Sequence, residues 1–403
     1  MTLEGSPPER TQGYPVALGL AIFLVQVALG TILYATFQKW APSALDAGDA
    51  WGGYLLAAYG AARFAFETPT GAISDRVERR LGLLIGFALM LPAIGLMAFV
   101  HDRYAYLGFS ALLGFATAFL WPATYAISAD RYTLDRRGKV IGFLNLAQLL
   151  GFGAGALAGA YLVAGPSGLQ FTLAAAAVLA ALAAALTGLP NYRQRSLFRL
   201  IPAVRRPSLR EVYSREFAVL GAIVLASSAG MAMIVPAIRP FGEDELRVSF
   251  ESLTLALAPG VVVGATLYIP AGHFADRFGR PRPFLAGEAL VVGGLLTCSA
   301  TDSLVVAATA AAAIFAGNVL TVPALNAAVM DAAPASHRGT VIGAMVALSG
   351  LGLAIGPAAG GAIVGAAGTG AAFRSAAAAC SVAAGMMAIY GWRSRPAARS
   401  RVV

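Results

Sequence analysis

The stretch PTGAISDRVERR, residues 69–80, recurs 201 residues later as PAGHFADRFGR, residues 270–280. Each copy follows a long apolar run and places an Asp-Arg pair shortly before further basic residues. The first copy concentrates five charged side chains in residues 71–80 of a chain that is only 12% charged. A charged break that recurs at a fixed offset between apolar runs indicates a duplicated chain whose halves share one architecture.

The same offset aligns further residues of the two halves without a gap. Arg137-Gly138 falls on Arg338-Gly339, and Gly155 falls on Gly356. Other aligned pairs are Pro122 with Pro323, Ala123 with Ala324, Asp130 with Asp331, Val140 with Val341, Ile141 with Ile342, Gly142 with Gly343 and Gly159 with Gly360. We therefore expect two halves of six helices each, related by an axis along the membrane normal.

The composition is that of a membrane protein. Hydrophobic residues make up 58% of the chain, and the mean hydropathy is +0.72. Charged residues supply half of the roughly 25% that is typical of a soluble domain. The apolar runs reach the roughly 20 residues that a helix needs to cross a bilayer. We predict an all-α polytopic protein with twelve spans, at about 14–36, 50–70, 81–100, 104–128, 138–164, 169–189, 217–238, 252–271, 283–300, 304–330, 339–367 and 371–392.

The basic residues predict the orientation of these spans. Of the 29 basic residues, 23 fall on the side of the termini, five fall on the opposite side, and Arg63 lies within a span. By the positive-inside rule, both termini are expected in the cytoplasm, with the protein in the cell (inner) membrane. The surplus of positive charge is thus an orientation signal and a lipid-facing surface, and we expect no nucleic-acid partner.

A long hydrophilic stretch divides the chain in half. It predicts an N-terminal bundle at 1–190, a basic cytoplasmic linker at 191–216, a C-terminal bundle at 217–392 and a basic cytoplasmic tail at 393–403. We expect the linker to lie on anionic lipid headgroups, with a partner-binding site as the alternative.

The repeated loop resembles the signature of the major facilitator superfamily, G-x-x-x-D-R/K-x-G-R-R/K between spans 2 and 3. It is present as GAISDRVERR at 71–80 and again as GHFADRFGR at 272–280, and the resemblance extends over essentially the whole chain. The first copy has Glu78 where the signature has glycine. The resemblance is to the 12-span type, closest in pattern to drug/proton antiporter-like exporters. It implies two bundles around a central cavity and transport by alternating access.

The resemblance also implies that the two loops latch the cytoplasmic gate. Asp75 would accept hydrogen bonds at the start of span 11, near Gly339, and Asp276 at the start of span 5, near Gly138. Arg131 would pair with Asp75. The alternative is a solvated turn that obeys the positive-inside rule. The predicted latch residues are Gly71, Asp75, Arg76, Arg79, Arg131, Gly272, Asp276, Arg277 and Arg280.

Small residues in spans 5 and 11 predict close helix packing. Glycines at four-residue spacing let helices approach closely in lipid, and a proline weakens one turn. We interpret them as packing between the halves. Span 11 carries glycines at this spacing together with Pro357. Antiporters of this family carry such a glycine and proline pattern in span 5, but span 5 of this chain has Ala156 in place of the proline. The residues concerned are Gly155, Gly159, Gly352, Gly356, Pro357 and Gly360.

Arg63 and Glu67 are the charged residues deepest in a predicted span. Intramembrane charges indicate function by default, so Glu67 is a candidate proton-coupling carboxylate, and Arg63 could tune it or meet an anionic substrate. Their four-residue spacing equally allows a structural pair in which each charge neutralises the other. Glu288, about one and a half turns into span 9, is expected to reach the interface.

The resemblance implies that spans 1, 5, 7 and 10 line the cavity, so their neutral polar residues at mid-depth are candidates for substrate contact, with Tyr34 and Trp121 as aromatic candidates that could stack on a ligand. Each of them could instead join helices. Ser110 stands where drug/proton antiporters usually carry an arginine early in span 4. The cavity candidates are Gln26, Tyr34, Trp121, Asn145, Gln148, Ser227, Ser228, Asn318 and Asn326.

The sequence shows no metal-ligand cluster, nucleophile constellation or phosphate-binding loop. We therefore expect a transporter that is not an enzyme, without cofactor or metal, acting as a monomer on a small-molecule substrate in contact with membrane lipids and protons. The leading hypothesis is proton-coupled efflux of drug-like or amphipathic compounds. The alternative is an uptake symporter or facilitator for a specific solute, such as an organic anion. A lipid flippase or a non-transporting sensor is more distant.

Overall fold

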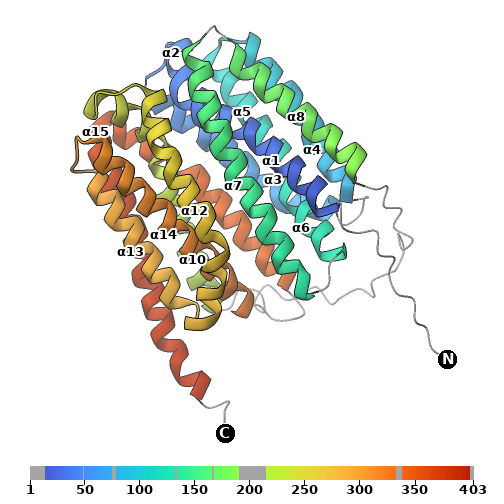
Figure 1. Cartoon of the computed structure of the whole chain (residues 1–403), viewed down its shortest axis with the longest axis vertical. Coiled ribbons are helices and arrows are strands. Elements are labelled where there is room, and N and C mark those ends of the chain that lie inside the picture. Colours follow the sequence, from blue (N-terminus) through green and yellow to red (C-terminus); the bar gives the residue numbers. More distant parts are fainter. Residues whose placement is uncertain are drawn as a thin grey trace, which may run out of the picture.

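The structure, a computed structural model, describes residues 14–48, 50–74, 79–131, 134–165, 168–189, 215–332 and 338–399. These residues form helices joined by short turns, without β-strands. Figure 1 shows two bundles side by side, with the start of α1 and the end of α15 toward the same end of the molecule. We call this end the terminal face, and we call the end that carries residues 45–48, 100–102 and 246–249 the opposite face.

The first bundle contains six crossings. The first crossing continues from α1 through the π-helical segment η1 into the short α2, beyond the predicted end at residue 36. The elements are α1 (Tyr14–Leu29), η1 (Gly30–Trp40), α2 (Ala41–Ala44), α3 (Ala50–Ser74), α4 (Arg79–Phe99), α5 (Arg103–Thr117), α6 (Leu120–Arg131), α7 (Leu134–Ala164) and α8 (Leu169–Gly188).

The second bundle repeats this arrangement. Of the predicted linker 191–216, the structure describes only Arg215 and Glu216, which begin α10. Gly368, with φ 79°, divides α15 into two crossings. The elements are α10 (Arg215–Met233), η2 (Val235–Ala237), α11 (Ile238–Pro240), η3 (Phe241–Glu245), α12 (Phe250–Phe278), α13 (Pro281–Cys298), α14 (Leu304–Ala332) and α15 (Arg338–Arg399).

The predicted fold class is confirmed. Among the described residues, nine helical segments are long and apolar enough to cross a membrane. One of them, Ala344–Trp392, contains both crossings of α15, and α3 and α13 lie outside the set. Both of these helices carry buried carboxylates, which lower their hydropathy. With them, the helices account for the twelve predicted crossings.

The fourth crossing is broken between α5 and α6, where the sequence predicted one continuous span. Pro122 has no N–H to donate to the carbonyl of Ala118, four residues earlier, and its ring crowds that carbonyl. The Thr70 hydroxyl of α3 donates to the Ala118 carbonyl instead, at 2.7 Å. The Ala118 carbonyl at the break is therefore satisfied, and the bond ties α3 to this crossing.

Each half has its own apolar core, and the halves meet along two pairs of helices. The first core is built by α1–α8, and two further clusters fill the second half. Between the halves, α3 packs against α15, and α7 packs against α12. The α3–α15 contact is close: a Cβ atom added to Gly53 would lie 2.4 Å from the carbonyl oxygen of Pro357.

Candidate functional site

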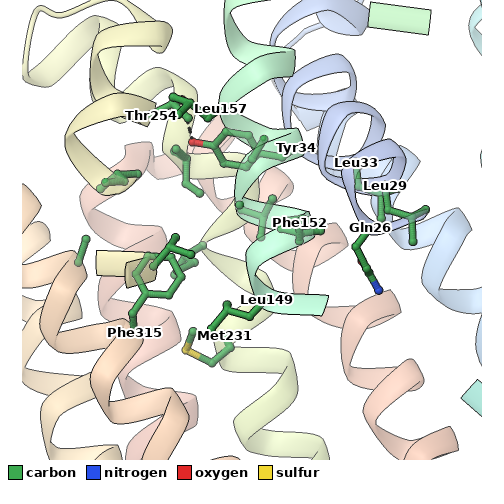
Figure 2. A pocket seen from close by; sticks show the side chains of 18 of the residues that line it. Gln26, Leu29, Leu33, Tyr34, Leu149, Phe152, Leu157, Met231, Thr254 and Phe315 are labelled. Carbon is green, nitrogen blue, oxygen red and sulfur yellow. Dashed lines mark hydrogen bonds between the residues drawn. The ribbon is translucent and has the colours of Figure 1, made fainter. Parts of the chain in front are cut away.

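A cavity of about 540 Å³ lies between the two halves. Its walls are mainly apolar, and both bundles contribute to them, as Figure 2 shows for Leu29, Phe152, Met231 and Phe315. Eight of the lining residues have polar groups or amphipathic rings. These are Gln26, Tyr34, Tyr59, Arg63, Thr117, Trp121, Gln148 and Thr254.

Contacts between the halves close the cavity toward the opposite face. The Tyr34 hydroxyl of η1 lies 3.2 Å from the Thr254 hydroxyl of α12, as Figure 2 shows. The Tyr34 ring also stacks on Phe250, with centroids 5.2 Å apart. Nearer the opposite face, Lys39 of the first half pairs with Glu243 of the second. Arg239 supports this pair from one turn away, with its Nη1 3.0 Å from Glu243 Oε2.

Arg63 and Glu67 form the ion pair that their spacing allows. Arg63 Nη2 donates to Glu67 Oε1 at 3.3 Å, and the Glu67 side chain is only 4% exposed. Arg63 lines the cavity and also interacts with Tyr59, whose hydroxyl accepts a bond from Thr117 at 3.1 Å. Glu67 Oε2 and Arg63 Nε have no hydrogen-bond partner among the described residues. The pair therefore lies beside the cavity with hydrogen-bonding capacity left over.

The structure separates the cavity candidates into two groups. Gln26, Tyr34, Trp121 and Gln148 line the cavity together with Arg63. The other five candidates are absent from the lining. Asn145 is half-buried on α7, Ser227 faces α13, Ser228 donates to the Val224 carbonyl, Asn318 is half-buried on α14, and Asn326 is exposed on α14.

The prediction that Glu288 reaches the interface is wrong. Its exposure is 1%, and the Ser227 hydroxyl of α10 donates to its Oε1 at 2.7 Å. The depth of Glu288 in α13 was predicted well enough, but the side chain points into the second bundle, where it cannot extend to water. Thr254 and Tyr59 were also missed, and neither carries a distinguishing signal in the sequence.

The predicted latch is described only in part. Asp75 and Arg76 lie outside the described ranges, as do the side chains of Arg79, Arg131 and Asp276, so the contacts expected of them stay predictions. Gly71 and Gly272 lie within α3 and α12. Arg277 lies in the last turn of α12, with its guanidinium carbon 5.7 Å from the Phe278 ring centroid.

The second copy of the loop joins two helices of its own half. Arg280 Nε donates to Asp331 Oδ2 at 2.8 Å, and this bond connects the start of α13 to the end of α14. Gly279, just after α12, has φ 78°, a conformation that favours glycine. Glu78 stands at the equivalent place in the first copy, in a segment that the structure does not describe.

Most glycines of the two motifs pack helices within their own half, whereas Gly361, next to Gly360 in α15, packs against Ala50 of the first half. Added Cβ atoms would lie 2.1 Å from the Val27 carbonyl oxygen at Gly155, and 2.4 Å from that of Ala229 at Gly356. Gly159, Gly352 and Gly360 make equally close contacts within their own halves, to Thr31, Ser228 and Met233. Of the motif residues, Pro357 makes the inter-half contact described above, through its carbonyl oxygen.

Comparisons with known proteins cover both halves. A profile of the family described as Major Facilitator Superfamily matches residues 16–227 and 220–402. "Multidrug resistance protein 1" of Bacillus subtilis (strain 168) is 25% identical over 57% of this chain, and the match covers 58% of that protein. "Multidrug resistance protein 2" of the same organism is 27% identical, over 77% of this chain and 78% of that protein.

Two solved structures share the fold. The human organic anion transporter MFSD10 (TETRAN) has a TM-score of 0.69 at 19% identity, over 95% of this chain and 100% of that one. A bacterial homolog of the human lysosomal transporter Spinster, in an inward-facing and occupied conformation, has a TM-score of 0.74 at 16% identity, over 96% and 97% of the two chains. At these identities the likeness concerns the fold.

Proposed function

The chain belongs to the Major Facilitator Superfamily, and from this premise we propose that it exports drug-like or amphipathic compounds in exchange for protons. Members of this family are multi-pass membrane transporters that move small molecules and are not enzymes. The observation that carries the proposal is the largely apolar cavity between the halves. The relatives named as multidrug resistance proteins support it.

The cavity walls favour recognition by burial of apolar surface. Each Å² of apolar surface removed from water contributes about 25 cal/mol, whatever the compound's pattern of polar groups. Side chains such as Phe152, Met231 and Phe315 offer surfaces of this kind, and methionine adapts to different shapes. Gln26, Gln148 and Thr254 are polar points that could orient one end of an amphipathic compound.

We assign the exchange of protons in the first half to Glu67. A proton on Glu67 would remove the charge that Arg63 pairs with and release the guanidinium toward the cavity that it lines. A free cation in an apolar cavity disfavours a cationic or apolar compound. Protonation from one side of the membrane and release of the compound on that side are thereby linked.

The distribution of basic residues supports an orientation with both termini in the cytoplasm of a cell membrane, 23 of the 29 lying on that side. With this orientation, the described conformation closes the cavity toward the outside, through Tyr34, Thr254 and the Lys39–Glu243 pair. We further propose that the transporter acts as a monomer in direct contact with lipids.

Glu67→Gln should remove the stimulation of transport by a pH gradient, because the amide cannot gain or lose a proton. The measurement is ethidium flux in proteoliposomes with and without the gradient, expressed as the ratio of the two rates. Glu251→Gln, in the first turn of α12, is the control and should keep the wild-type ratio. A wild-type flux indifferent to the gradient would contradict proton coupling, and an unchanged ratio in Glu67→Gln would contradict the assignment to Glu67.

A second candidate function is the uptake of an organic anion. Arg63 supports it, because this guanidinium lines the cavity and its Nε lacks a partner among the described residues. A protein of the same fold is named as an organic anion transporter.

Arg63→Gln distinguishes the two candidates. If anions are the substrates, the variant should lose fluorescein uptake while any flux of ethidium persists, since only the anion needs the positive charge. If efflux of amphipathic compounds is the function, wild-type protein should move ethidium and leave fluorescein behind. Proteoliposome assays with both dyes measure this, and flux of neither dye would favour a flippase or a sensor.

A further inference from the structure

A second buried carboxylate lies in the C-terminal half, away from the cavity. Glu288 of α13 is 1% exposed and is not among the residues that line the cavity. It sits where three helices meet: Ser227 of α10 donates to its Oε1 at 2.7 Å, and Cys380 of α15 interacts with its side chain. Its other oxygen, Oε2, is buried without a hydrogen-bond partner among the described residues.

Within the described part of the chain, Glu288 has no positively charged partner. Over the described residues, no Lys, Arg or His forms a salt bridge with it. Its neighbours along α13, Phe284 and Val291, are buried apolar residues. Glu67 provides the contrast, because Arg63 compensates its charge.

The helices packed on α13 carry few other titratable groups near this point. In α10 they are Arg215 and Glu216, in the first turn, and in α14 the described one is Asp331, at the far end. In α12 they are Glu251 at the start, Tyr268, and then His273, Asp276 and Arg277 near the end. Those of α15 are Arg338 at its start, the exposed Arg374, the buried Cys380, Tyr390 and the terminal Arg393, Arg395 and Arg399. Among the side chains that the structure describes, Cys380 is the titratable group shown to interact with Glu288.

We propose that Glu288 is a proton-binding site of the C-terminal half and that it carries its proton in the conformation described here. An ionised carboxylate in this place would keep only the Ser227 hydroxyl and the weakly donating Cys380 thiol and would lose the rest of its hydration, so burial disfavours the charged form. A proton on Oε2 removes the charge while Oε1 still accepts from Ser227.

The position of α10 connects this site to the cavity. Ser227 is followed by Ser228, which packs against Gly352 of α15, and one turn later Met231 lines the cavity. A shift of α10 during transport would therefore change the contact between Ser227 and Glu288. When the contact between α10 and α13 opens to water, the carboxyl group of Glu288 transfers its proton to a water molecule, and the carboxylate is hydrated. This step rests on the proposed transport function, whereas the protonation itself does not.

Infrared spectroscopy of the full-length protein in lipid nanodiscs tests the protonation without any transported compound. Wild-type protein should show the C=O stretching band of a protonated carboxyl group near neutral pH, and Glu288→Gln should lose it. Glu67→Gln should keep the band, because Glu67 is paired with Arg63. Ser227→Ala should shift the band to higher frequency, since the C=O group loses its hydrogen bond. Identical spectra of wild type and Glu288→Gln would overturn the inference, as would an unshifted band in Ser227→Ala if Glu288→Gln does not fold.

Flux measurements test the coupling. The ratio of ethidium flux with and without a pH gradient should fall in Glu288→Gln and stay at the wild-type value in Glu251→Gln. A wild-type ratio in Glu288→Gln would overturn the link between this proton and transport. The two proposals can be contradicted separately. Gradient-stimulated flux of the wild-type protein without the infrared band would contradict the proposal for Glu288 alone. The infrared band without any wild-type flux would contradict the transport proposal alone.

Discussion

Replacing Gly53 by leucine should strongly slow transport in a protein whose two halves remain folded. Gly53 lies in α3, at the contact between the halves on the opposite face, and a Cβ atom there would lie 2.4 Å from the backbone oxygen of Pro357 and 3.2 Å from the Cα of Gly361. Backbone atoms of a packed helix cannot turn aside as a side chain can. The leucine must therefore hold the halves apart on this face, where the structure closes them.

The expected size of the effect follows from the cost of overpacking. An added side chain in a packed contact costs about 1–3 kcal/mol, and here the whole cost falls on the closed conformation. Since about 1.4 kcal/mol is a factor of ten, the ratio of the closed to the open conformation should fall by roughly fivefold to about 150-fold. Transport by alternating access needs this conformation in every cycle, so the rate should fall with its population.

Flux and thiol labelling together measure this effect. Cys298 lines the cavity, so a membrane-impermeant maleimide added at the opposite face should label it faster in Gly53→Leu than in wild type. Cys298→Ser identifies the label, because Cys380 is buried elsewhere. Gly365→Leu is the matched control, since a Cβ atom there meets nothing within 4 Å. Wild-type flux in Gly53→Leu would show that the halves do not close through this contact.

Gly155→Leu should destabilise the first half itself. A Cβ atom at this position would lie 2.1 Å from the Val27 carbonyl oxygen and 2.8 Å from the Val27 Cα, so α1 and α7 must separate. The Thr31 hydroxyl, which lies 3.1 Å from the Gly155 carbonyl, would lose that contact. We expect a loss of at least about 3 kcal/mol, at the upper end of the overpacking range.

The control variant for Gly155→Leu lies on the same helix. Gly142, also in α7, has nothing within 4 Å of an added Cβ atom, and leucine is the better helix former by about 1 kcal/mol. Gly142→Leu should therefore keep or raise the thermal unfolding midpoint in detergent, whereas Gly155→Leu should lower it sharply. Equal midpoints for the two variants would contradict the view that the glycines set the distance between these helices.

The sequence predicted the architecture because its signals are strong along the chain. Runs of about 20 apolar residues define crossings, and the 201-residue offset defines the two halves. The pairing of Arg63 with Glu67 was also accessible, because residues four apart lie on one face of a helix. Even the unexpected break before α6 has a local cause, since Pro122 removes the hydrogen bond to Ala118.

The directions of side chains were harder to predict, for a physical reason. In a soluble helix the apolar stripe marks the core, but in a bilayer both the lipid and the core accept apolar residues. The sequence of α13 is apolar on every face around Glu288. The sequence therefore predicts how deep Glu288 lies in the helix, but it does not predict that the side chain is buried in the protein. The same ambiguity placed Asn326 among the cavity candidates, although it is exposed, and missed Thr254, whose contact with Tyr34 depends on the other half of the chain.

The glycine motifs also have an evolutionary consequence. The glycines that hold α1 against α7 and α10 against α15, such as Gly155 and Gly356, are not among the residues of the cavity wall. The wall is built from large side chains such as Leu29, Phe152 and Met231. Selection can thus alter the range of compounds that descendants of this chain accept by replacing wall residues one at a time, while the helical framework is inherited intact.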